Sequence, residues 1–145
     1  MKILKRLILV TLISTIAFAC NKDDDGGGNT TAENQVKIIG TWKYTSSTTN
    51  GVVDMNNYIC NFEETYEYNA SSVINKYYGD PSGDDGSNCQ LEGTYTVNYS
   101  IDGNSLSSTD DGFTYTQAIL VLNSTTLILQ DVDGDDIYTE TYTKQ

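Results

Sequence analysis

The sequence predicts an all-β domain, an eight-stranded antiparallel up-and-down barrel, behind an export signal and a flexible tether. Apolar and polar residues alternate along several short segments, which is typical of strands with one buried and one exposed face. Turn-forming residues separate these segments at short intervals. The sole proline, Pro81, lies in a loop, so every strand keeps its backbone donors.

The chain begins with basic residues, continues with an apolar run from Leu7 to Ala19, and then reaches Cys20. The run is shorter than the roughly 20 apolar residues that span a bilayer. A basic start before a short apolar core is typical of a secretory signal. Residues 1–20 resemble a bacterial lipoprotein signal, which implies cleavage before Cys20 and lipidation of that cysteine. An ordinary secretory signal or an uncleaved anchor helix is the alternative.

Residues 20–34 contain mainly Asp, Gly, Asn and Thr, a composition that predicts a disordered tether. The acidic run Asp23-Asp24-Asp25 resembles the export tag of lipoproteins on the outer leaflet of the outer membrane. A plain solvated tether is the alternative. We therefore expect the folded domain to cover residues 35–145, with one short helix over residues 33–39 before the first strand.

The charge of the chain limits its partners. It has 20 acidic and 8 basic side chains, a net charge of −12. Cleavage of the signal would remove three basic side chains, Lys2, Lys5 and Arg6, and no acidic one. The mature chain then has a net charge of −15. This charge repels nucleic acid and anionic head groups. Membrane attachment then depends on the lipid at Cys20.

The strands predicted in the domain are connected mostly by tight turns. Without closure, such a sheet leaves exposed edges, and closure gives a barrel whose mouth holds side chains or one small ligand. A two-sheet sandwich is the alternative, but it needs longer crossing connections. Strands of five to eight residues predict a shallow cup. The expected strands cover residues 41–46, 65–68, 73–78, 91–99, 105–109, 113–122, 126–130 and 137–144.

The segment Ile38-Ile39-Gly40-Thr41-Trp42-Lys43 resembles the opening of the lipocalin-like domains of secreted bacterial lipoproteins, a helical turn followed by Gly-x-Trp. Residues 60–68, 93–106 and 119–129 are similar to later strands of that family. The resemblance covers about residues 36–143 and implies structural roles for Gly40 and Trp42, with Trp42 plugging the closed end. In lipocalins proper an Arg packs over this Trp. The mature chain has no Arg, and Lys144 is the late cation that could replace it.

Cys60 and Cys89 are expected to form a disulfide, because export places them in an oxidising compartment. Such a bond would stabilise the fold by roughly 3–4 kcal/mol on the chain-entropy model. Two separate buried thiols are the alternative. The chain has no His, and two thiolates alone do not make a zinc site. A calcium loop starting at Asp131 would need Gly at its sixth position and an acid at its twelfth, but these are Asp136 and Tyr142, so we expect a hairpin turn and no metal.

The residue pattern predicts a protein without enzymatic activity or cofactor. Glu63 and Glu64 are neighbours on a strand and point to opposite faces, so they cannot flank one bond. Histidine and a Gly-x-Ser-x-Gly elbow are both missing from the sequence. Asp110 and Asp111 are interpreted as turn residues, as are Asp84 and Asp85.

Tyrosine is overrepresented, with 11 Tyr against 3 Phe. Six of these rings fall at alternating positions and could share the interior face, where an apolar body with a polar tip suits an amphipathic ligand or a sugar. The alternative is that the rings simply fill a small barrel. The candidate ligand-binding residues are Tyr44, Tyr66, Tyr68, Tyr95, Tyr99 and Tyr115.

Two functional hypotheses follow. In the first, an outer-membrane lipoprotein on the cell surface binds a small amphipathic or hydrophobic molecule in its barrel. In the second, a filled barrel contacts a protein or glycan through its acidic face and the loops at residues 50–59 and 79–88. An open cavity of roughly 300 Å³ or more would favour the first hypothesis.

Overall fold

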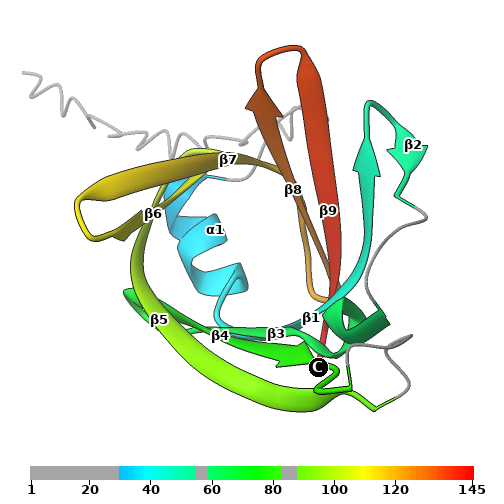
Figure 1. Ribbon diagram of the computed structural model, residues 1–145. Coiled ribbons are helices and arrows are strands. Elements are labelled where there is room, and N and C mark those ends of the chain that lie inside the picture. Colours follow the sequence, from blue (N-terminus) through cyan, green and yellow to red (C-terminus); the bar gives the residue numbers. More distant parts are fainter. Residues whose placement is uncertain (1–29, 55–58, 83–87) are drawn as a thin grey trace, which may run out of the picture.

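The computed structural model describes residues 30–54, 59–82 and 88–145. These residues form one continuous antiparallel sheet, one α-helix and one 3-10 helix (Figure 1). The elements are α1 (Thr31–Lys37), β1 (Gly40–Thr49), β2 (Val52–Val53), η1 (Ile59–Glu63), β3 (Thr65–Tyr68), β4 (Ser72–Gly79), β5 (Gln90–Asp102), β6 (Ser105–Asp110), β7 (Phe113–Leu122), β8 (Thr126–Asp133) and β9 (Asp136–Lys144).

The sheet closes into a barrel. Its strand order is β2-β1-β3-β4-β5-β6-β7-β8-β9, and β1 also pairs with β9. The two-residue strand β2 extends only the far end of β1, so eight strands form the closed wall. Every pairing is antiparallel and joins strands that follow one another around the wall. The structure therefore confirms the predicted up-and-down barrel and excludes the sandwich.

Strand lengths differ from the prediction in one respect that matters for the cup. Strands β3 and β7 have the expected bounds, whereas β5 covers 13 residues, longer than the strand expected at residues 91–99. It is longer because β4 pairs with its first part and β6 with its last part, the two meeting at Asn98. Figure 1 shows β5 curving along the wall. The barrel is consequently deeper on this side than the sequence suggested.

Helix α1 lies across one end of the barrel (Figure 1). Thr30 and Glu33 form a capping box that starts the helix at Thr31, two residues before the expected start. Asn34 is buried, and its Nδ2 donates to the Gly103 carbonyl at 2.8 Å. Helix α1 therefore contacts the barrel through a residue that the sequence placed at the end of the tether.

Trp42 fills the same end of the barrel. Its ring is fully buried, and Nε1 donates to the Ile38 carbonyl at 2.6 Å. Lys144 Nζ lies 4.9 Å from the ring centroid and donates to the Lys37 carbonyl. Gly40 has a φ of +127°, and a Cβ there would lie 2.8 Å from the Lys144 side chain. Lys144 thus packs over the tryptophan, in the place of the Arg of lipocalins proper, as the resemblance implied.

The opposite end is the mouth, where the Asn50-Gly51 turn precedes β2. Both turn residues have positive φ, 52° and 78°, as a tight hairpin requires. The chain then enters η1, and Cys60 bonds to Cys89 just before β5, with Cα atoms 5.3 Å apart. The predicted disulfide is confirmed. It fastens η1 to the wall at the start of the longest strand.

The expected signal, the lipidation site Cys20 and most of the expected tether lie outside the described residues, as do parts of both long loops. In the part of the chain that the structure covers, no helix combines the length and the apolar character needed to cross a bilayer.

Candidate functional site

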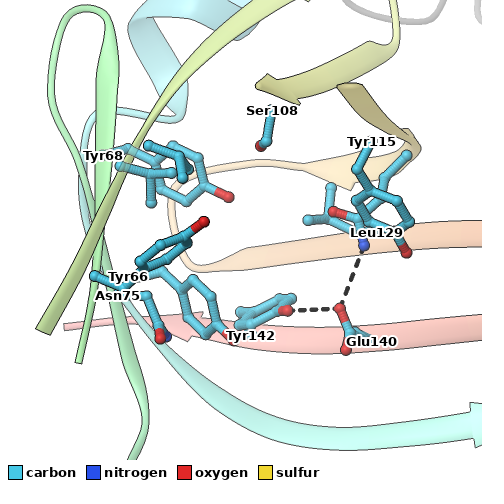
Figure 2. Close-up of a pocket in the computed structure, with 12 residues that line it drawn as sticks. Tyr66, Tyr68, Asn75, Ser108, Tyr115, Leu129, Glu140 and Tyr142 are labelled. Carbon is cyan, nitrogen blue, oxygen red and sulfur yellow. Dashed lines mark hydrogen bonds between the residues drawn. The ribbon is translucent and has the colours of Figure 1, made fainter. Parts of the chain in front are cut away.

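A cavity of about 310 Å³ occupies the barrel between the Trp42 end and the mouth (Figure 2). Seven of the wall strands, β3 to β9, contribute side chains to it. Its lining combines aromatic rings, short apolar groups and a few polar groups. The lining residues are Tyr66, Tyr68, Val73, Asn75, Tyr95, Val97, Ser108, Tyr115, Gln117, Leu129, Glu140 and Tyr142.

Four of the six expected tyrosines meet at this cavity: Tyr66, Tyr68, Tyr95 and Tyr115. Tyr95 and Tyr115 are 45% and 50% exposed, so the cavity is reachable from solvent at the mouth. Tyr66 and Tyr68 sit deeper, and Tyr68 is buried. The strand alternation therefore placed these four rings correctly on the inner face.

Tyr44 and Tyr99 are not part of the lining. Tyr44 packs beside η1, with its ring centroid 5.7 Å from that of Phe62. Tyr99 stands edge-on to Tyr68 at 5.1 Å, and its hydroxyl donates to the Asn69 carbonyl. Tyr99 thus packs toward the Trp42 end, whereas Tyr44 lies opposite the cavity residue Tyr142 in the strand register and packs against η1. Alternation predicts the face of a side chain but not its height along the barrel axis.

The sequence analysis missed Tyr142 and Glu140, which enter the cavity from β9. The Tyr142 hydroxyl donates to Glu140 Oε2 at 2.7 Å, and Gln117 Nε2 reaches the same oxygen at 3.4 Å (Figure 2). The Tyr142 ring meets that of Tyr66 edge-on at 5.2 Å. Glu140 and Tyr142 are separated by one residue on the strand expected at residues 137–144. This spacing places both side chains on the same face of the sheet.

A second carboxylate, Glu64, lies just before β3 and accepts the Tyr66 hydroxyl at 3.1 Å. Burial raises the pKa of the Glu64 carboxyl, and the charge of Glu140 raises it further, while the Tyr66 hydrogen bond opposes the shift. Glu63 instead binds Lys43 Nζ at 3.0 Å, so the two neighbouring glutamates have separate partners. The expected strand position of the two residues is wrong, because Glu63 ends η1 and Glu64 lies between η1 and β3.

Burial is also the main cause of the raised pKa values of Tyr66 and Tyr142. The carboxylates of Glu64 and Glu140 add to the effect, because a nearby negative charge disfavours a phenolate. Both hydroxyls therefore stay protonated and act as donors to the carboxylates.

Two more tyrosine–carboxylate pairs stand nearer the mouth. Tyr115 donates to Asp131 Oδ2 at 2.6 Å, and Tyr95 donates to Asp110 Oδ2. The aspartate of the second pair was expected only as a turn residue. Here it also fixes a ring of the cavity.

The mouth widens into a second hollow of about 590 Å³ between β5, β6 and β7. Tyr95, Val97, Ser108 and Tyr115 line both spaces, so the hollow continues into the deeper cavity. Phe113 stands at its edge with 82% of its surface exposed. The exposed Phe113 ring therefore forms an apolar edge of the opening, which leads into the tyrosine-lined cavity, called the cup below.

Within residues 30–54, 59–82 and 88–145, no three His, Cys, Asp or Glu side chains are grouped so that they could hold a metal ion. The acidic segment at residues 131–136 forms the tip of the β8–β9 hairpin, as expected, with Asp133 paired to Asp136 across the turn at Gly134 and Asp135.

A protein-family model described as a lipocalin-like domain matches residues 38–129. A lipocalin-like protein from Bacteroides uniformis ATCC 8492 shares the fold at 16% identity and a TM-score of 0.50, over 75% of this chain and 99% of its own. An uncharacterized protein from Bacteroides eggerthii DSM 20697 does so at 12% identity and a TM-score of 0.51, over 74% and 98%. A search of curated proteins finds no match. At these identities the two structures show the fold alone.

Proposed function

The chain belongs to the lipocalin-like domain family, and on this premise we propose that it is a lipid-anchored envelope protein whose barrel binds a small amphipathic or hydrophobic molecule. The cavity carries the proposal. It has about 310 Å³, within the range of small-molecule sites, and its rings and polar tips converge on one space. A barrel filled only by its own side chains would leave no such space.

Ser108 offers the sharpest test, because its small side chain lines both the deep cavity and the mouth hollow. Replacing it with Trp fills the entrance. Its neighbour Ser107 bonds to Thr116 on the outer face, so Ser107→Trp is the matched control. Both changes are made in the full mature chain carrying Cys20→Ala, so that neither lipid nor detergent competes for the cavity.

The uncharged dye Nile red is the probe. We expect enhanced, blue-shifted fluorescence with the parent chain, a loss of affinity of about tenfold or more in Ser108→Trp, and little change in Ser107→Trp. Equal binding by all three chains, or no binding by the parent chain, would contradict a ligand site in the barrel.

The anchor is the second part of the proposal. The signal-like segment before Cys20 supports lipidation, and the acidic run after it supports export to the outer leaflet of the outer membrane. Labelled palmitate should enter the wild-type protein and not Cys20→Ala, and protease added to intact cells should degrade the wild type. Equal labelling of both proteins would overturn the anchor, and protection from protease would overturn the surface location.

A non-enzymatic role is proposed with it, since the cavity groups are aromatic rings, amides, a hydroxyl and a carboxylate that suit holding a ligand. The interaction hypothesis also has a specific observation in its favour. Val52 and Val53 at the mouth are 69% and 56% exposed. A protein partner would be expected to cover these side chains.

A further inference from the structure

We propose that the cavity selects a cationic amphiphile, a molecule with an ammonium or amine head group on an apolar body. The inference rests on the proposed function and adds to it the sign of the ligand's charge. It depends on three features of the described residues: where the carboxylates lie, where the lysines lie, and what the rings present to a ligand.

Glu140 in the cup and Glu64 behind its lining tyrosine Tyr66 both have neutral partners. Glu140 lines the cavity and receives its hydrogen bonds from Tyr142 and Gln117, neither of which carries a positive charge. Glu64 is held in the same way by Tyr66 and is close enough to feel the charge of Glu140. Hydrogen bonds from neutral donors orient these groups but do not compensate their charge.

The four lysines of the described residues lie elsewhere. Lys144 packs over Trp42 at the closed end and donates to the carbonyl of Lys37, which ends α1 there. Lys43 is paired with Glu63. Lys76 follows the cavity residue Asn75 on β4 and so points to the outer face. Within the described ranges, no lysine lines the cup, so its carboxylates are left to attract the cation of a ligand.

The rings add an attraction that also depends on the sign of the charge. Tyrosine faces attract cations, most strongly ammonium groups removed from water. Tyr66, Tyr142 and Tyr115 line the cavity while their hydroxyls donate hydrogen bonds to carboxylates. Each carboxylate draws the hydroxyl proton toward itself, and this leaves the aromatic ring more electron-rich. A carboxylate or sulfate head group would meet repulsion from both rings and carboxylates.

The mouth repeats this arrangement. Asp110 and Asp131 hold Tyr95 and Tyr115 where the ligand enters. A cation is thus attracted along the whole path from the mouth to Glu140, and an anion is repelled along it. Phe113 and Val97 supply the apolar contact for the body of the ligand.

The test compares three probes with the same eight-carbon chain: octyltrimethylammonium, 1-octanol and octanoate. Each is titrated by calorimetry into the full mature chain carrying Cys20→Ala, and into the same chain with Glu140→Gln. Glu67→Gln is the matched control, because it removes one carboxylate from the outer face of β3. It reduces the net negative charge of the protein by the same amount as Glu140→Gln.

We expect the ammonium probe to bind about tenfold more tightly than octanol, with octanoate weakest. Glu140→Gln should shrink the preference for the cation to about threefold or less, whereas Glu67→Gln should leave it unchanged. The ranking in the parent chain is informative by itself if the Glu140→Gln protein does not fold.

The outcomes separate the two levels of the argument. Equal binding of the ammonium probe and octanol, or tighter binding of octanoate, overturns the charge preference and leaves the ligand site standing. A preference that Glu67→Gln reduces as much as Glu140→Gln also overturns it, because the effect then comes from overall charge. If none of the three probes binds, the ligand site fails and the charge preference fails with it.

Discussion

Lys144 contributes to stability through two contacts at the closed end, the Trp42 ring and the carbonyl at the C-terminus of α1. Both contacts need the ammonium group, so Lys144→Met should lower the free energy of unfolding by about 1–2 kcal/mol. Lys76→Met on the outer face of β4 is the control, with an expected change within about 0.5 kcal/mol. Urea denaturation measures both, and equal midpoints for the two variants would refute a special role for Lys144.

Glu64 should make stability depend on pH. Burial raises the pKa of its carboxyl above the usual 4.5, so the unfolded chain loses this proton at lower pH than the folded one. The contribution of Glu64 to stability therefore falls as pH rises from the unfolded-state pKa to the folded-state pKa. Glu64→Gln keeps a partner for Tyr66 without the charge, and should be more stable than the wild type at neutral pH.

This advantage should narrow as the pH falls to about 4, where the wild-type carboxyl is largely protonated. Urea midpoints at the two pH values, with Glu67→Gln as the control, give the comparison. A gap that stays constant or widens in acid would show that burial of the Glu64 charge does not cost stability.

At the scale of elements, the disulfide decides how firmly η1 is held against the wall. Cys60 and Cys89 close a loop with a sequence separation of 29 residues. The double variant Cys60→Ser, Cys89→Ser should lose about 3–4 kcal/mol of stability, since the unfolded chain regains the freedom of that loop. Reduction of the wild type should give the same loss. A reduced protein with an unchanged urea midpoint would contradict this role.

Elements with strict alternation or clear turn residues could be predicted from the sequence, and β3 and β7 have their expected bounds. The two valines of β2 carry no alternation, so nothing marked them as a strand. Helix α1 starts two residues earlier than expected, because Thr30 and Glu33 form a capping box there.

The site was predictable only in part, for a reason of geometry. Period-two alternation puts Tyr44, Tyr66 and Tyr99 on one face, but the stagger between strands decides which ring reaches the cavity. Tyr66 does so, whereas Tyr99 packs nearer the closed end and Tyr44 packs against Phe62 of η1. The partners of the carboxylates depend on the same stagger, so Glu140 could be recognised only once the strand register was known.

For the molecule as a whole, the two ends of the barrel differ in packing: one is filled with side chains and the other surrounds open space. The closed end is filled by the buried side chains of Trp42 and Ile38, beside α1. The mouth half keeps its tyrosines and carboxylates around open space. This division lets one small domain combine a packed core with a cup for a ligand.

The central claim is that the cup holds a small molecule, and native mass spectrometry of the protein purified from its own host tests it most directly. The account predicts an additional mass, bound without a covalent link, on the wild type and on Ser107→Trp, and its absence from Ser108→Trp. If the wild type and both variants carried only the mass of the chain and its lipid, the barrel would not be a ligand-binding cup.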